Sequence, residues 1–174
     1  KLIFGLESYN QRVLDAMKKG VELSWVDETS EACMKLGIAM HFYLICGFPT
    51  ETEPEVMDSI NFVLNNQRLL DSPGFSAILS QFDLERGAPI EKNPAEWGIT
   101  KLYTPPEHDL SLGYTYETTI GMSSDEANVL YQQLIEKLGR EVMTFPHNYS
   151  LSDGLLYLSH HQKHSLPERL GAPA

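Results

Sequence analysis

The sequence predicts an α/β fold in which parallel strands alternate with helices. Two short apolar runs, at residues 2–6 and 38–46, and a mixed stretch at residues 75–82 have the length of strands. The segments between them carry apolar residues at helical spacing and are bounded by helix-capping residues. This alternation is typical of right-handed βαβ units in a parallel sheet. We therefore expect three parallel strands, followed by an irregular and helical carboxyl-terminal region.

The run at residues 38–46 is the centre of this prediction. It is apolar except for His41 and is much shorter than the roughly 20 residues that a membrane span requires. The run does not alternate between apolar and polar residues, which favours a strand covered by helices on both faces. Gly47-Phe48-Pro49 then predicts a sharp turn at the carboxyl end of the strand, where parallel α/β folds bind their ligands.

Capping residues define the first two predicted helices. Asn10 is a suitable N-cap for a helix that Gly20 ends. Ser24, with Asp27 three residues later, predicts the start of a second helix, and Gly37 ends it.

The later helices are predicted by similar signals. Thr52-Glu53-Pro54-Glu55 combines a capping box with Pro in the first turn, and this helix should end near Leu70. Residues 83–123 contain several prolines and scattered aromatic residues without a period, so we expect irregular structure there. A capping box at Ser123-Ser124-Asp125-Glu126 opens a long helix, and residues 153–164 predict a last one.

Composition indicates an acidic globular protein. The 174 residues carry a formal net charge of −11, which argues against a nucleic-acid partner. The only cysteines, Cys33 and Cys46, fall in a predicted helix and a predicted strand, which favours free buried thiols in a reducing cytoplasm. No signal peptide or membrane-spanning run is present in the sequence. Because the chain starts at Lys1 and enters an apolar strand at once, we expect a fragment of a longer protein.

Three stretches of the chain carry a resemblance to a known family. Residues 2–20, LIFGLESYNQRVLDAMKKG, contain a strand ending in Gly-x-Glu-Ser, then a helix, then Met-x-Lys-Gly. Residues 37–52, GIAMHFYLICGFPTET, contain a strand followed by Gly-x-Pro and an acidic residue. In this order and spacing they resemble the radical S-adenosylmethionine superfamily, in the carboxyl-terminal half of its barrel. Residues 86–99, RGAPIEKNPAEWGI, resemble members that also have a cobalamin-binding domain.

The resemblance implies a fold and a reaction. It implies a partial (β/α) TIM-like barrel over residues 1–84 and a carboxyl-terminal extension over residues 85–174. The family cleaves S-adenosylmethionine reductively, and the resulting 5′-deoxyadenosyl radical abstracts hydrogen from a substrate, here a small molecule. The C-x-x-x-C-x-x-C motif that holds the family's [4Fe–4S] cluster is absent from this sequence. We therefore expect no catalytic residue and no metal ligand in this chain, which should be inert without the amino-terminal half and prone to self-association through open strand edges.

The resemblance also assigns cofactor-binding residues. Glu7 would accept hydrogen bonds from the ribose hydroxyls, and Ser8 would support it. Lys19 would approach the cofactor carboxylate, while Ile45 and Gly47 would line the adenine. Each residue also has a structural alternative: a capping or surface carboxylate for Glu7, a helix cap for Ser8, a helix-end charge for Lys19, core packing for Ile45 and a turn for Gly47.

Two other interpretations remain open. The chain could be a non-catalytic half-barrel module that binds a partner or a nucleotide. It could also belong to an RNA-modifying methylthiolase relative, although the acidic composition argues against that class. The spacing of His160, His161 and His164 leaves both metal binding and no role open for these side chains.

Overall fold

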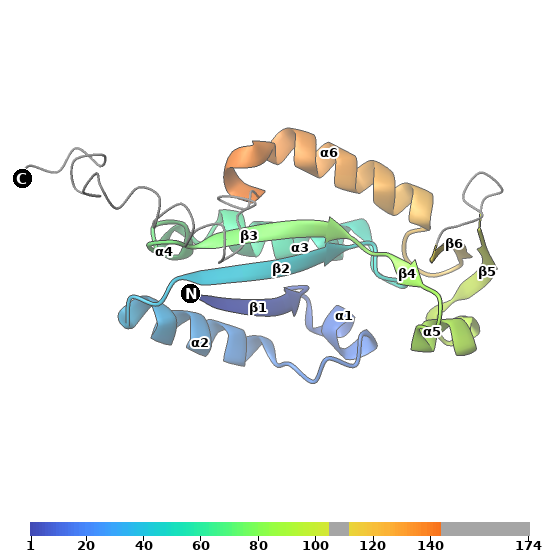
Figure 1. Ribbon diagram of the computed structural model, residues 1–174, viewed down its shortest axis with the longest axis horizontal. Helices are drawn as coiled ribbons and strands as arrows, with labels where there is room; N and C mark the ends of the chain where they lie inside the picture. Colours follow the sequence, from blue (N-terminus) through green and yellow to red (C-terminus); the bar gives the residue numbers. More distant parts are fainter. Residues whose placement is uncertain (105–111, 144–174) are drawn as a thin grey trace, which may run out of the picture. The chain divides into compact units, whose positions relative to one another are not determined.

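The computed structural model describes residues 1–104 and 112–143, and the side chains of residues 1–104 and 112–136. Residues Lys1–Thr144 form one compact unit. In chain order the elements of this unit are β1 (Leu2–Glu7), α1 (Gln11–Ala16), α2 (Leu23–Lys35), β2 (Met40–Cys46), α3 (Glu53–Leu64), α4 (Gln67–Leu70), β3 (Ser76–Gln81), β4 (Leu84–Glu85), α5 (Pro89–Lys92), a 3₁₀ turn η1 (Pro94–Trp97), β5 (Ile99–Tyr103), β6 (Gly113–Thr118) and α6 (Ser124–Met143), as Figure 1 shows. The predicted helix at residues 153–164, with His160, His161 and His164, lies outside the described residues.

The predicted parallel sheet is confirmed. Its strand order is β1-β2-β3, and both neighbouring pairs are parallel. Helices α1 and α2 connect the first two strands, and α3 and α4 connect the next two. The sheet is open, with no closed barrel among the described strands.

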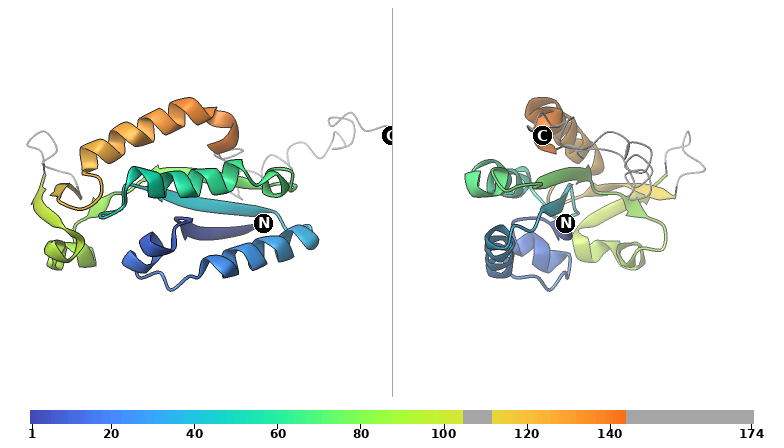
Figure 2. Two further views of the ribbon diagram at one scale, coloured as in Figure 1. Left: turned by 180° about the vertical axis from the view of Figure 1, so that it is seen from behind. Right: turned by 60° about the vertical axis from the view of Figure 1, so that its left-hand side comes forward.

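The helices of the described residues cover one face of this sheet, so within this part of the chain the expectation of helical cover on both faces is wrong. The buried apolar residues of β2, Met40, Phe42, Leu44 and Cys46, form one core with apolar side chains of α2, α3 and α6. His41, on the opposite face of the strand, is also buried. Figure 2 shows these helices on the same side of the strands. The reason is topological: two successive right-handed crossovers that step in the same direction across a sheet place their helices on the same face. On the other face Tyr43 and Ile45 remain half-buried.

Local capping signals were mostly correct. The Asn10 side chain accepts the amide N–H of Val13, and the capping boxes at Thr52–Glu55 and Ser123–Glu126 are both present. The box expected at Ser24 and Asp27 is wrong, since α2 already begins at Leu23.

Two helix ends also differ from the prediction. Helix α1 ends at Ala16, earlier than Gly20 indicated. The helix expected to continue to Leu70 is divided at Asn66, whose side chain accepts the amide N–H of Leu69 and so caps a separate short helix, α4.

The irregular structure expected at residues 83–123 is partly wrong. Strands β4, β6 and β5 form a second, antiparallel sheet in that order. This sheet contributes Leu84, Ile99 and Tyr116 to a second apolar core, which also contains Trp97 and Phe48. The boundary proposed between residues 84 and 85 falls within β4, and the two-domain division stays a prediction.

Helix α6 closes the first core. Ala127, Leu130 and Leu134 recur at helical spacing and are all buried against the parallel sheet and α3. Among the described residues, no helix combines the length and apolar character needed to cross a bilayer.

Candidate functional site

The carboxyl end of β1 has an unusual backbone that places Glu7 over Gly5. Pairing with β2 shifts by one residue between Gly5 and Glu7, and Glu7 has a φ of 66°, which non-glycine residues rarely adopt. A Cβ added to Gly5 would lie 2.7 Å from Oε1 of Glu7. Glycine at position 5 therefore leaves the space that the Glu7 carboxylate occupies.

Lys19 completes this arrangement. Its Nζ lies 2.9 Å from Oε1 of Glu7, and the Glu7 side chain is 15% exposed. Oε2 of Glu7 has no hydrogen-bond partner among the described residues. The carboxylate thus keeps one oxygen available to a ligand while the other is neutralised.

A groove of about 370 Å³ lies beside Glu7 at the carboxyl ends of the three parallel strands. We call it the strand-end groove, and its lining comprises Gly5, Glu7, Tyr43, Leu44, Ile45, Ser80, Gln81, Phe82 and Asp83. Its volume falls in the range of roughly 300–1,000 Å³ that is typical of small-molecule sites. Glu7 and Asp83 contribute two carboxylates against the single ammonium of Lys19, so the groove is acidic.

Some of the cofactor-binding residues predicted from the sequence lie at the strand-end groove, and others do not. Glu7 and Ile45 line the strand-end groove, and Lys19 is bonded to Glu7. Ser8 is fully buried and faces α3, where its hydroxyl lies 3.3 Å from that of Ser59. Gly47 is not among the lining residues.

The position of Gly47 has a packing explanation. Its φ is 89°, and an added Cβ would lie 2.4 Å from Cβ of Ala127 at the start of α6. Glycine is required here because the turn and the helix approach each other closely. This role coexists with the predicted contact to adenine, which stays a prediction.

A buried carboxyl group organises the turn at residues 47–51. Oε2 of Glu51 accepts the amide N–H groups of Gly47, at 2.8 Å, and Phe48, at 3.3 Å. The side chain is fully buried, and Oε1 has no hydrogen-bond partner among the described residues. Burial raises the pKa of Glu51 to about 7, against the opposing effect of the two amide N–H groups.

Three further contacts hold this turn from outside. The hydroxyl of Tyr116 in β6 donates to the carbonyl oxygen of Gly47 at 2.5 Å, and the amide of Met122 donates to the carbonyl oxygen of Glu51 at 2.9 Å. Arg12 of α1 donates to the carbonyl oxygen of Thr50 at 2.9 Å. The strand end beside the groove is therefore fixed by α1, by β6 and by the segment before α6.

Arg12 also forms a salt bridge with Glu55 in the first turn of α3. The guanidinium of Arg12 lowers the pKa of Glu55 to about 2, and the Thr52 amide and hydroxyl act in the same direction.

The described residues do not contain a metal site. No group of three or more His, Cys, Asp or Glu side chains in residues 1–104 and 112–136 could hold an ion. Cys33 and Cys46 are free and buried, as the sequence predicted. Burial raises the pKa of Cys46 to about 12, which keeps it a thiol and not a thiolate ligand.

Tyr43 and Asp83 also line the groove, and neither is among the site residues predicted from the sequence. A signal for Asp83 was present, because it follows the third predicted strand as Glu7 follows the first. Polar residues directly after parallel strands gather at one edge of the sheet. Tyr43 lies within the stretch at residues 37–52 that carries the resemblance, but no role was assigned to it.

No protein-family model, curated protein or solved structure was found to match the chain.

Proposed function

We propose that this chain forms the nucleoside-binding half of a radical S-adenosylmethionine enzyme. The observation that carries the proposal is the Glu7 carboxylate, held over Gly5 at the end of β1 and open to the strand-end groove through Oε2. The motif resemblance at residues 2–20 and 37–52 supplies the family. The full enzyme would generate a 5′-deoxyadenosyl radical that abstracts hydrogen from a small-molecule substrate, and cobalamin would be a second cofactor in the relatives that residues 86–99 resemble.

Glu7, Ile45 and Lys19 each have a role in this proposal. Oε2 of Glu7 accepts hydrogen bonds from the ribose hydroxyls, and charge-assisted bonds of this kind are stronger than neutral ones. Ile45 offers an apolar surface to the adenine ring. Lys19 interacts with the carboxylate of the cofactor while neutralising part of Glu7. The excess of carboxylates in the groove suits a ligand with a positive sulfonium.

The iron–sulfur cluster does not fit the described residues. Cluster ligands are thiolates, whereas Cys33 and Cys46 are buried, lie on different elements and are too few. We therefore assign binding and positioning of the nucleoside to this chain, and no step at the cluster.

The outer strand supports the proposed partner. β1 is at the edge of the parallel sheet, and Ile3 and Leu2 on it are 64% and 46% exposed. Such an edge can pair with another strand, which we propose belongs to the amino-terminal half of the same barrel. In the isolated chain the same edge should cause self-association, and Ile3→Lys should reduce it. Sedimentation velocity showing a monomer at high concentration would contradict this expectation.

Calorimetric titration of the chain with adenosine tests the binding role. We expect saturable binding of adenosine and S-adenosylmethionine, and weaker binding of adenosine monophosphate because its phosphate is repelled by the acidic groove. Glu7→Gln should weaken adenosine binding by about tenfold or more, since a hydrogen bond to a charged group is lost. Glu28→Gln, at an exposed position of α2, is the matched control and should have no effect.

The outcome for each ligand separates the alternatives. No adenosine binding, or equal binding to wild type and Glu7→Gln, would refute the nucleoside-binding role. Adenosine binding without 5′-deoxyadenosine production, after the chain is joined to its upstream sequence and supplied with iron and sulfide, would favour the non-catalytic module.

A further inference from the structure

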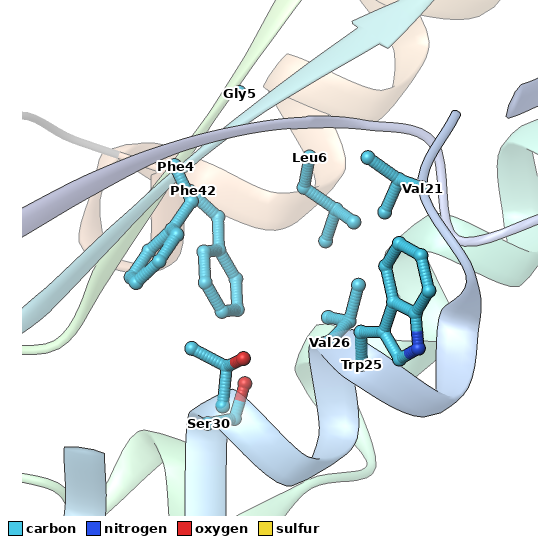
Figure 3. A pocket seen from close by; sticks show the side chains of 9 residues that line it. Phe4, Gly5, Leu6, Val21, Trp25, Val26, Ser30 and Phe42 are labelled. Carbon is cyan, nitrogen blue, oxygen red and sulfur yellow. The ribbon is translucent and has the colours of Figure 1, made fainter. Parts of the chain in front are cut away.

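A second pocket lies on the opposite, helix-covered face of β1. It is between β1 and the first half of α2, and its volume is about 170 Å³. We call it the α2 pocket, and its apolar walls are Phe4, Leu6, Val21, Trp25, Val26 and Phe42 (Figure 3). An apolar cavity of about 150 Å³ can hold one benzene molecule, so this pocket has the size of a single ring.

Aromatic side chains line two sides of the α2 pocket. Phe4 and Phe42 meet edge to face, with ring centroids 5.7 Å apart. Figure 3 shows these two rings across the pocket from the Trp25 indole. Trp25 is 55% exposed, although it is a large apolar residue. Aromatic walls of this kind favour an aromatic ligand, because offset and edge-to-face ring contacts add to the burial of apolar surface.

Two residues with hydroxyl groups, Thr29 and Ser30, also line the α2 pocket. Ser30 lines the pocket and is only 5% exposed, and its hydroxyl has no hydrogen bond to any described residue. Figure 3 shows Ser30 next to the Phe4 and Phe42 side of the pocket. The Ser30 hydroxyl is not among the fully buried side-chain atoms that lack a partner, so it is open to the pocket and to water in the free chain. A ligand with one hydrogen-bonding group would supply a partner for it.

The walls are held in place without a ligand. Gln11 of α1 donates to the carbonyl oxygen of Val21 at 2.9 Å and accepts the amide N–H of Leu23 at 3.0 Å. The hydroxyl of Tyr9 donates to Asp27 of α2 at 2.8 Å. Since the segment leading into α2 and the helix itself are both fixed, a ligand would not need to order them on binding.

From these observations we propose that the α2 pocket binds a small, single-ring aromatic molecule with one hydrogen-bonding substituent. The ring lies among Phe4, Phe42 and Trp25, and the substituent reaches Ser30. A phenol is the simplest ligand of this class. This site lies on the opposite face of β1 from the strand-end groove, with Gly5 as their shared lining residue, and does not depend on the proposed nucleoside-binding function.

Nuclear magnetic resonance of the ¹⁵N-labelled chain provides the test. The chain has two tryptophans, so the indole N–H of Trp25 reports on the α2 pocket and that of Trp97, buried in the second core, is an internal control. The Trp25→Phe variant assigns the two signals. Titration with p-cresol should shift the Trp25 signal to saturation and leave the Trp97 signal in place.

Variants test the geometry of the site. Ser30→Ala should weaken p-cresol binding by about tenfold and leave toluene binding nearly unchanged, because only p-cresol uses the hydroxyl. Ser24→Ala, at an exposed position of the same helix, is the matched control and should change neither. Val26→Phe should fill the pocket and abolish binding of both, and Val21→Phe provides a second filling substitution at a half-buried position if the first unfolds the chain.

Three results would overturn the proposal. The first is a p-cresol titration that never saturates, or that moves both indole signals alike. The second is an equal effect of Ser30→Ala on p-cresol and toluene. The third is binding of N-acetyltyrosinamide at least tenfold tighter than p-cresol, which would assign the pocket to a tyrosine side chain of another polypeptide.

Discussion

The buried carboxyl group of Glu51 leads to a prediction about the pH dependence of stability. Its pKa is about 7 in the folded chain and 4.5 in an unperturbed carboxyl group, because burial disfavours the charged form. Between these two values the folded state binds more protons than the unfolded state, so stability falls as the pH rises from 4.5 towards 7. At 1.36 kcal/mol for each pH unit, the loss amounts to about 3 kcal/mol.

Glu51→Gln should remove this loss. The amide is a neutral substitute for the protonated carboxyl group, and its carbonyl oxygen can still accept the amide N–H groups of Gly47 and Phe48. At about pH 5 the variant and the wild type should have similar free energies of unfolding. At about pH 8 the variant should be more stable, by about 3 kcal/mol.

Urea unfolding at several pH values measures this difference. Comparing the variant with the wild type at each pH cancels the effect of other groups, such as His41, whose pKa is lowered by burial and which therefore acts in the opposite direction. Glu28→Gln, at an exposed position, should follow the wild type throughout. A Glu51→Gln variant whose difference from the wild type is the same at pH 5 and pH 8 would refute this account of the buried carboxyl group.

Four further substitutions have defined outcomes in chemical denaturation. Gly121→Ala should destabilise the chain by about 3 kcal/mol, because the added Cβ would lie 2.4–2.7 Å from backbone atoms of the 47–51 turn. Gly37 also has a positive φ, but an added Cβ there would meet no atom within 4 Å, so Gly37→Ala should cost only about 1 kcal/mol. The Arg12 salt bridge holds the folded pKa of Glu55 below its unfolded value. Glu55→Gln should therefore lower the free energy of unfolding near neutral pH by about 1 kcal/mol, and it should reduce the loss of stability as the pH falls from 4.5 towards 2. Leu134→Ala should cost about 3 kcal/mol, since the side chain is 5% exposed in the core beneath α6; an effect below 1 kcal/mol would contradict that placement.

The strands and most helix caps of the first sheet could be predicted because their signals are local. Asn10 caps α1 through a residue three positions later, and the Thr52 box acts within one turn. The apolar run at residues 38–46 identified β2 but not its environment. A run without alternation does not show whether the second face is covered by helices or borders a groove, and here Tyr43 and Ile45 border one.

The parts that were missed depend on contacts between distant residues. β4 has only two residues, and its pairing with β6 crosses a long segment that no local period identifies. The motif predicted Gly47 as a ligand contact. Its packing against Ala127 could not be predicted, because it depends on where α6 packs on the parallel sheet. The association of Glu7 with Lys19 follows from the fold of the first βα unit, and the two were selected for related roles without being expected to bond.

The bond from Tyr116 to the carbonyl oxygen of Gly47 has a consequence for how the groove can change. The residue after β2 is held by β6, which lies much later in the sequence. The shape of the groove therefore depends in part on a strand that does not line it. Substitutions in β6 or at the start of α6 can therefore change which ligands the groove prefers. A comparison of related sequences that considers only the residues lining the groove would miss such changes.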